Sequence, residues 1–178
     1  MHALSRLIAL AAILIVAGGT AQAADPENTI LMDVPAGRVV IELRPDLAPK
    51  TVARIKELTR RGFYDGIIFH RVIAGFMAQT GDPKGTGMGG SGQKLAAEFS
   101  KEHLVRGTVS MARAQDPNSA DSQFFICFAP APFLDGKYTI FGKVTAGMEF
   151  IDAIAKGEPP AKPDKIIKMQ VAADAKKS

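Results

Sequence analysis

The residues with the clearest chemical potential lie in Phe69–Asp82, which reads FHRVIAGFMAQTGD. One arginine, Arg71, stands in an apolar run, and an aromatic residue, a methionine and an amide follow it as Phe76, Met77 and Gln79. Strand-period alternation and a central glycine predict two short strands here. Because a guanidinium is always charged and presents rigid donors, it needs a partner or a task among apolar groups. The pattern predicts that these four side chains converge on one concave surface.

On its own, this stretch favours a plainer interpretation, in which Arg71 is a structural arginine bonded to a carboxylate or to loop carbonyls. A second region favours a functional role for Arg71 instead. It contains SQFFIC at Ser122–Cys127, FLDGK at Phe133–Lys137 and FGKV at Phe141–Val144. Taken in order with the first stretch, these segments resemble the cyclophilins, a family of peptidyl-prolyl cis-trans isomerases. The long first stretch is the most specific of them.

The resemblance implies a role for each residue of the site. Arg71 would donate a hydrogen bond to the imide nitrogen of the substrate or to the neighbouring carbonyl. Gln79 would position Arg71 and the substrate, so these two are the predicted catalytic residues. Nine further residues are the predicted substrate-binding residues. Those that would line the proline pocket are Phe76, Met77, Phe125 and Leu134. Gln123 would hold the substrate backbone, Ala112 and Arg113 would offer main-chain contacts, and Phe133 and Tyr138 would flank the groove. For any single aromatic residue the alternative is core packing, which we assign to Phe69 and Phe124.

The reaction that this family catalyses requires few chemical groups from the protein. Rotation about the X-Pro bond is opposed by amide conjugation, with a barrier of roughly 18–20 kcal/mol. No bond between heavy atoms breaks, so no nucleophile, metal or cofactor is expected. The catalyst needs a dry pocket for the proline ring, donors that favour the twisted amide and anchors for the flanking backbone.

Three positions depart from the best-known eukaryotic pattern. Arg113 stands where asparagine is usual, Phe133 where tryptophan is frequent and Tyr138 where histidine is frequent. Phenylalanine at position 133 and tyrosine at position 138 are similar to the bacterial secreted branch of the family. Because Phe133 lacks the indole N–H donor, the resemblance implies weak binding of cyclosporin.

The N-terminal segment has the three parts of a secretory signal peptide. Arg6 precedes an apolar run from Leu7 to Ala17, and the small-residue triplet Ala21-Gln22-Ala23 follows. We therefore predict a signal peptide over residues 1–23 and a single mature domain over residues 24–178, located in the periplasm. The apolar run is short for a membrane span, which needs about 20 residues. An uncleaved anchor and a buried N-terminal helix are the alternatives.

Charge and cysteine content exclude several classes of protein. The formal net charge is +4, and removal of Arg6 with the signal peptide lowers it to +3. The basic residues are scattered, which argues against nucleic-acid binding. The single cysteine, Cys127, permits no internal disulfide, and its apolar neighbours predict a buried, inert thiol. The expected partners are proline-containing polypeptides, with a monomeric protein and no stable membrane insertion after cleavage.

The remaining chain reads as short strands with two separate helices. A hairpin is expected at Thr29–Val34 and Arg38–Leu43, and a glycine-rich loop at Gly81–Gly92 is expected to wall the groove. Helices are expected from Pro49 to Arg61 and at Met148–Ala155. Two strands are expected within 67–80, and an edge strand at 94–99. Further strands are expected at 107–112, 123–128, 139–144 and 165–172. The tail over 173–178 is expected to be frayed.

This pattern points to a mainly β fold, and the resemblance implies a closed eight-stranded antiparallel β-barrel capped by two α-helices. The substrate groove would lie outside the barrel. Two other functions fit the sequence less well. One is a chaperone or assembly factor that binds proline-containing segments with little turnover. The other is an unrelated barrel that holds a small ligand in its interior.

Overall fold

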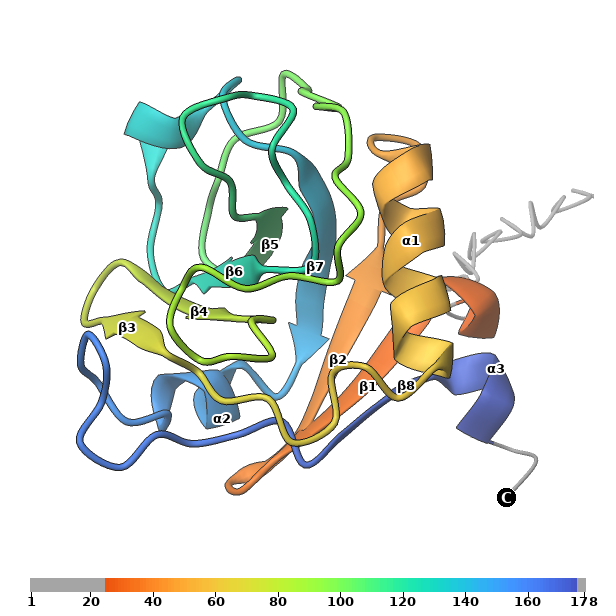
Figure 1. The fold of residues 1–178 in the computed structure, drawn as a ribbon. Helices are drawn as coiled ribbons and strands as arrows, with labels where there is room; N and C mark the ends of the chain where they lie inside the picture. Colours follow the sequence, from red (N-terminus) through yellow and green to blue (C-terminus); the bar gives the residue numbers. More distant parts are fainter. Residues whose placement is uncertain (1–24, 176–178) are drawn as a thin grey trace, which may run out of the picture.

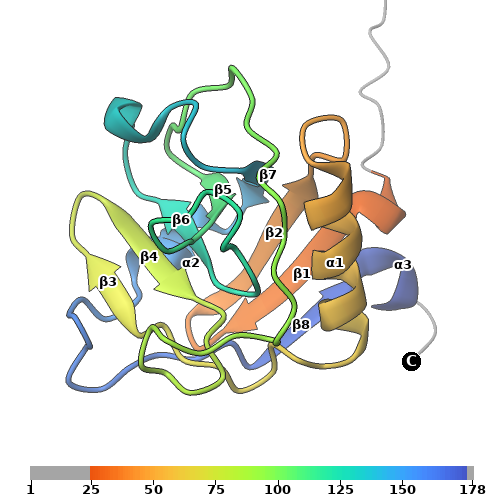
Figure 2. The ribbon, with the colours of Figure 1, turned by 45° about the horizontal axis from the view of Figure 1, so that its top comes forward.

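The fold is built on one curled antiparallel sheet of eight strands (Figures 1 and 2). The structure is a computed structural model that describes residues 25–175, so the predicted signal peptide lies outside the described residues. The strand order is β3-β4-β6-β5-β7-β2-β1-β8. The strands are β1 (Thr29–Val34), β2 (Gly37–Leu43), β3 (Arg71–Ile73), β4 (Met77–Thr80), β5 (Thr108–Met111), β6 (Phe124–Cys127), β7 (Ile140–Ala146) and β8 (Lys168–Val171).

The β1–β2 hairpin shows how the residue pattern forms the sheet. Its register runs from Thr29 opposite Glu42 to Val34 opposite Gly37. Alternate residues of both strands are buried, as period-two patterning requires. Gly37 has φ +155°, and a Cβ there would lie 2.6 Å from the ring of Phe150. The turn therefore needs a glycine, and the predicted hairpin is confirmed.

The sheet is curled but open, so the predicted closed barrel is not confirmed. Its two edge strands are β3 and β8, and within residues 25–175 no ladder joins them. The chain between α2 and β8 lies along the free edge of the β3 region instead. Isolated bridges there pair Val72 with Gly157 and Ile68 with Lys165. This segment occupies the hydrogen-bonding edge that closure would have required.

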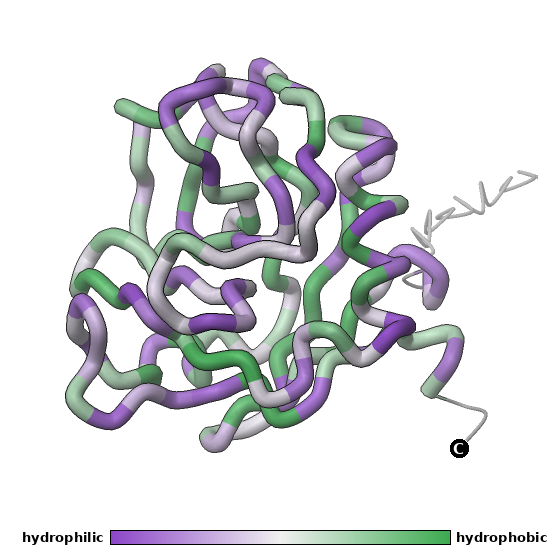
Figure 3. Tube along the Cα trace, viewed as in Figure 1, coloured by the Kyte–Doolittle hydropathy of each residue, from purple (hydrophilic) through white to green (hydrophobic). Residues whose placement is uncertain are grey.

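Two helices pack on different sides of the curled sheet, as predicted (Figure 1). Helix α1 (Pro49–Arg60) contacts β8, and α2 (Met148–Asp152) contacts β2. Along α1, hydrophilic and hydrophobic residues alternate, as expected of a helix with one buried face (Figure 3). The carboxylate of Glu98 accepts hydrogen bonds from the backbone N–H groups of Lys50 and Thr51, at 3.0 and 2.8 Å, and so satisfies two free donors of the first turn.

Several predicted boundaries were wrong. The predicted strand at 94–99 is reduced to one bridge, because only Leu95 pairs, with Ala120. The first strand of the 67–80 segment begins at Arg71, and α2 ends at Asp152 rather than Ala155. Residues 172–175 form a short helix, α3 (Ala172–Ala175), where the last residue of a strand (172) and the start of a frayed tail (173–178) were expected. Arg60 binds Asp174 of this helix at 2.8 Å, which holds it against α1. Two 3-10 turns, η1 (Pro26–Asn28) and η2 (Pro132–Leu134), complete the described elements.

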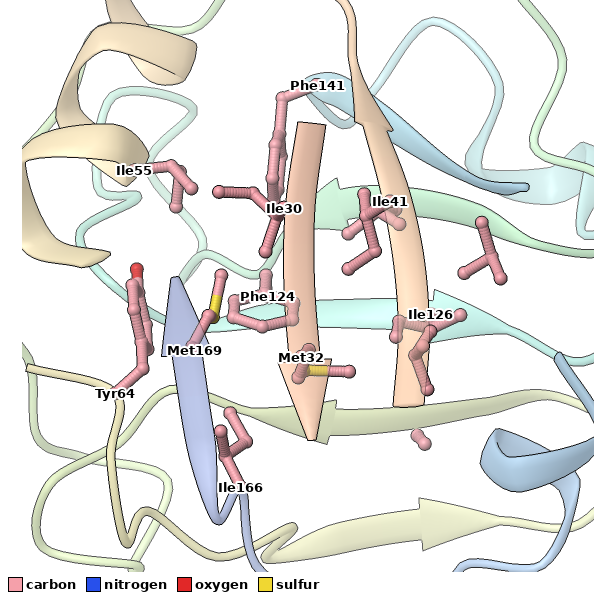
Figure 4. Close-up of a cluster of buried hydrophobic side chains, with 14 of the residues drawn as sticks. Ile30, Met32, Ile41, Ile55, Tyr64, Phe124, Ile126, Phe141, Ile166 and Met169 are labelled. Carbon is pink, nitrogen blue, oxygen red and sulfur yellow. The ribbon is translucent and has the colours of Figure 1, made fainter. Parts of the chain in front are cut away.

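The interior of the curled sheet is filled by apolar side chains (Figure 4). Phe124 is fully buried and meets the rings of Tyr64 and Phe141 edge-on, at centroid distances of 5.5 and 6.0 Å. Phe69 is fully buried as well, so the core assignment of Phe69 and Phe124 is confirmed. A second, smaller cluster of buried residues lies apart from this core, with Met77, Phe125 and Cys127 among its members.

Candidate active site

Strand register places the polar residues of the site in one row. Arg71 on β3 lies opposite Gln79 on β4, and Gln79 lies opposite Phe125 on β6. Directly opposed residues of antiparallel strands project to the same face. Their immediate neighbours Val72 and Ala78 belong to the inner core. Since successive side chains alternate between faces, the row lies on the outer face of the sheet.

A groove with a volume of about 300 Å³ lies over this row. Ten of the eleven residues predicted for the site line it: Arg71, Phe76, Met77, Gln79, Ala112, Arg113, Phe125, Phe133, Leu134 and Tyr138. The eleventh, Gln123, lines an adjoining hollow of about 360 Å³, which shares Gln79, Ala112 and Arg113 with the groove. The structure therefore brings the predicted residues together, on the expected outer face.

The floor and one wall of the groove are apolar. Met77 and Phe125 are buried at 1% and 4% exposure and belong to the second cluster, against which Phe76, Leu134 and Tyr138 pack. The ring of Phe125 meets Tyr138 edge-on at a centroid distance of 5.8 Å. This arrangement offers a dry surface for a small apolar ring such as pyrrolidine.

Phe133 forms the exposed rim of the groove. Its side chain is 60% exposed, and its ring lies 5.4 Å from that of Phe76 at a tilt of 45°. Phe133 and Leu134 belong to η2, which Pro132 begins. Asp135, directly after this turn, accepts a hydrogen bond of 2.8 Å from Leu104 N–H. The rim aromatic is thus carried by a turn that is tied to the second cluster.

A chain of amide hydrogen bonds links the row to the glycine-rich loop. Gln79 Nε2 donates to Gln123 Oε1 at 2.9 Å. Gln123 Nε2 donates in turn to the carbonyls of Gly87 and Gly89, at 3.0 and 2.8 Å. The loop therefore walls the hollow beside the groove, as predicted. The predicted substrate-backbone contact of Gln123 has to compete with these internal bonds.

Asp82 holds the glycine-rich loop in place, a role that sequence analysis did not identify. Its carboxylate accepts hydrogen bonds from the N–H groups of Lys84, Thr86 and Gly87, at 2.8, 2.9 and 2.6 Å. Burial opposes ionisation of this group, but the backbone donors prevail and lower its pKa below the ordinary value. His70 lies beneath Gly87, and burial lowers its pKa. An aspartate at the start of a glycine-rich loop is the signal that could have revealed this anchor.

Arg71 is bonded to a carboxylate, the kind of partner that the plainer interpretation of this residue expected. Arg71 Nε donates to Glu158 Oε1 at 2.6 Å, whereas the side-chain bond of Gln79 goes to Gln123. Glu158 lies 87 positions further along the chain, and sequence analysis missed it. Its surroundings carry no catalytic motif, so no local signal could have found it.

Arg113 supports the groove with its side chain. Its guanidinium lies over the Tyr138 ring, at 4.7 Å from the centroid. Its Nε and Nη2 atoms donate to the Lys137 carbonyl, at 3.1 and 2.9 Å. Ala112 N–H donates to the Gln123 carbonyl at 2.9 Å, so this N–H is already part of the protein's own bonding.

Cys127 lies under the groove as an inert residue. It is fully buried, and burial, assisted by the charge of Asp135, raises its pKa to about 12. Burial argues against a thiolate nucleophile, and the predicted burial of Cys127 is confirmed. Among residues 25–175, no cluster of three or more histidine, cysteine or acidic residues has the arrangement of a metal site. Over the same range, no helix is long and apolar enough to cross a membrane.

Comparison of the sequence with known proteins finds one family. Residues 29–171 match the family model described as cyclophilin type peptidyl-prolyl cis-trans isomerase/CLD. A probable peptidyl-prolyl cis-trans isomerase of Brucella suis is 55% identical over 94% of both chains. A peptidyl-prolyl cis-trans isomerase-like 1 protein of Rhizopus delemar is 49% identical over 68% of this chain and 76% of its own.

Solved structures agree with this result. The crystal structure of a cyclophilin from Hirschia baltica matches with a TM-score of 0.79 at 30% identity, over 85% of this chain and 76% of the other. A cyclophilin-type isomerase of Cryptosporidium parvum, crystallised in the presence of the dipeptide Ala-Pro, matches with a TM-score of 0.74 at 32% identity, over 80% and 98%.

The curled sheet with its outer apolar groove, arginine and paired amides defines a prolyl isomerase of the cyclophilin fold. With the family model matched over most of its length, the chain belongs to the cyclophilin-type peptidyl-prolyl cis-trans isomerases. Its activity is the rotation of X-Pro peptide bonds.

Proposed function

We propose that the groove around Arg71 performs this isomerisation on proteins exported from the cytoplasm, in the periplasm of a bacterium. The observation that carries the placement of the site is the cross-strand row of Arg71, Gln79 and Phe125 over an apolar floor. The row supplies a fixed donor, a polar link and a ring surface within one groove. The row and the groove are formed by residues of one chain, so the proposed reaction as a monomer needs no residue from a second copy.

The proposed mechanism uses the difference between planar and twisted amides. In the ground state, the imide nitrogen shares its lone pair with the carbonyl, and this conjugation creates the rotational barrier. At the twisted transition state the lone pair returns to nitrogen, where it accepts a hydrogen bond from the Arg71 guanidinium. The donor thus stabilises the transition state more than either planar isomer, which is the requirement for catalysis.

The apolar part of the groove holds the ring while the acyl side rotates. Phe76, Met77, Phe125 and Leu134 line the part of the groove proposed for pyrrolidine. The crystal structure of the Cryptosporidium relative was determined in the presence of Ala-Pro, a dipeptide with the same ring. That supports the proline-binding role proposed for these residues.

Export rests on the N-terminal pattern. The triplet Ala21-Gln22-Ala23 after an apolar run is typical of a cleaved signal peptide. The Phe133 and Tyr138 variants also resemble the bacterial secreted branch. We therefore propose that the mature enzyme comprises residues 24–178 and assists the folding of exported proteins.

Two measurements test the proposed function. The first is an isomerisation assay of residues 24–178 on a proline-containing peptide, with peptide binding measured beside it. Acceleration supports enzymatic action on clients, whereas binding without acceleration would favour the alternative of a proline-binding chaperone. The second is N-terminal sequencing of the protein after export. It should begin at Ala24, and a chain that retains Met1 in the membrane would contradict the proposed location.

A further inference from the structure

The chain between α2 and β8 brings a carboxylate to the guanidinium at the centre of the site. Arg71 Nε donates to Glu158 Oε1 at 2.6 Å. Glu158 is not among the residues that line the groove. It therefore contacts Arg71, the proposed catalytic arginine, from outside the lining of the groove.

The backbone next to this ion pair is tied directly to β3. Val72 N–H donates to the Gly157 carbonyl at 2.8 Å, and Gly157 N–H donates to the Val72 carbonyl at 2.9 Å. Each of these residues is the chain neighbour of one member of the ion pair. At the other end of the segment, Phe69 N–H donates to the Asp164 carbonyl at 2.9 Å. The carboxylate thus belongs to a segment that is bonded to β3 at one end and to the residues just before β3 at the other.

The composition of this segment restricts its motion further. Prolines occupy three of the five positions 159–163, and each fixes φ in its own residue. Pro160 is buried. Gly157 has φ +147°, and a Cβ there would lie 2.6 Å from Pro160 Cα, so only glycine fits. Exposed ion pairs usually contribute little because both side chains must be ordered; here the backbone that carries the carboxylate is already ordered.

The position of the contact on the guanidinium determines its effect. Nε is the nitrogen attached to the side-chain stem, and a carboxylate bonded there restricts rotation of the planar group. Four N–H bonds remain on the two terminal nitrogens, and these are the donors that a substrate in the groove can meet. A donor that is oriented before the substrate binds loses less conformational freedom at the transition state.

We propose that Glu158 is a positioning residue for isomerisation: it holds the Arg71 guanidinium so that its terminal N–H groups face the twisted prolyl amide. The inference rests on the proposed role of Arg71. It predicts that Glu158 acts on the rate of rotation rather than on proline binding, because the apolar floor binds the ring without it.

The test compares Glu158→Ala and Glu158→Gln with a matched control. Arg38 and Asp33 form a similar exposed pair, with Nε to Oδ1 at 2.7 Å, on the β1–β2 hairpin, so Asp33→Ala is the control. For Glu158→Ala we expect kcat to fall about threefold to tenfold, the scale of one hydrogen bond, with KM nearly unchanged. Glu158→Gln should lose less, because its amide oxygen can still accept from Nε. Asp33→Ala should retain full activity.

A double-mutant cycle separates positioning from general stabilisation. In an Arg71→Ala background, Glu158→Ala should cause no further loss, because the group that it orients is gone. An equal loss in both backgrounds would overturn the proposal. So would an unchanged kcat for Glu158→Ala beside an inactive Arg71→Ala, which would leave the proposed function intact. If Arg71→Ala is fully active, the proposed function of Arg71 fails first.

A spectroscopic measurement gives an independent answer. The Arg71 Nε–H proton should show slowed exchange with solvent in the ¹⁵N spectrum of the natural protein. Glu158→Ala should remove that protection while the backbone spectrum stays folded. Rapid exchange of this proton in the natural protein would contradict the proposal. Should the alanine variant fold poorly, Glu158→Gln keeps the shape and size of the side chain and should show a smaller loss of protection, because a neutral amide oxygen is a weaker acceptor than a carboxylate.

Discussion

Strand β6 serves two different parts of the molecule within four residues. Phe124 and Ile126 belong to the large core inside the curled sheet, whereas Phe125 and Cys127 belong to the second cluster beneath the groove. Both pairs are buried, at 4% exposure or less. The difference lies in what covers them, since the inner pair is enclosed by the protein alone and Phe125 faces the open groove.

The comparison shows how one sheet separates stability from catalysis. Because side chains alternate between faces, adjacent residues of β3, β4 and β6 can be optimised for different tasks. We expect changes on the inner face to act mainly on the free energy of unfolding. Changes on the outer face should act mainly on turnover or inhibitor binding, with smaller effects on stability.

The largest effect is expected for Phe124→Ala on the inner face. It removes a fully buried ring that contacts Tyr64 and Phe141, and truncations of this kind cost about 3–5 kcal/mol. Urea denaturation followed by circular dichroism would measure the change. The fraction that remains folded should keep its activity per molecule. A loss of less than 1 kcal/mol would mean that the two faces are not energetically distinct.

On the outer face, Arg71→Ala should retain the fold and lose roughly tenfold to a hundredfold in kcat/KM. That range corresponds to one charge-assisted hydrogen bond of about 1.5–3 kcal/mol. Arg71→Lys should also be poor, because an ammonium cannot reproduce the planar fork. Arg38→Ala, which removes another exposed, ion-paired arginine, is the control for both. Near-normal turnover in Arg71→Ala, with an unchanged melting temperature, would remove Arg71 from the mechanism.

A smaller effect is expected at the rim, where Phe133→Trp should strengthen inhibition by cyclosporin. The indole adds an N–H donor that contributes about 0.5–1.5 kcal/mol, together with extra contact area. A rigid cyclic inhibitor has little entropy left to lose on binding, so it gains more than a flexible peptide. Inhibitor titration during isomerisation measures the change, and turnover on a short peptide should move much less. Tight inhibition of the natural protein would show that an aromatic ring without a donor suffices.

The smallest effect is expected for Cys127→Ala, directly opposite Met77 in the sheet. The thiol is buried and its pKa is raised by burial, so its removal should leave turnover nearly unchanged. Little volume is lost, and the expected cost in stability is about 1 kcal/mol. Denaturation measures the change in stability, and the peptide assay on the same preparation measures turnover. Loss of turnover in a folded variant would assign the thiol to the reaction.

Much of this protein was predictable from local sequence. The hairpin, the start of α1 at Pro49 and the strand at β6 follow from apolar periodicity, turn residues and proline placement. These signals operate between residues that are close in the chain. The site residues were predicted in a different way, through the resemblance of FHRVIAGFMAQTGD and SQFFIC to one family. The structure then brought them into one groove and the adjoining hollow.

Tertiary structure alone decided three further features. The sheet is open because the segment near Gly157 occupies the edge of β3 that closure would have used. Gln123 is bonded to the glycine-rich loop, and Arg71 is bonded to Glu158. Each of these contacts joins segments more than 30 positions apart. Local patterning constrains neighbours within a strand or a helical turn, whereas such contacts depend on where the packed sheet carries each loop.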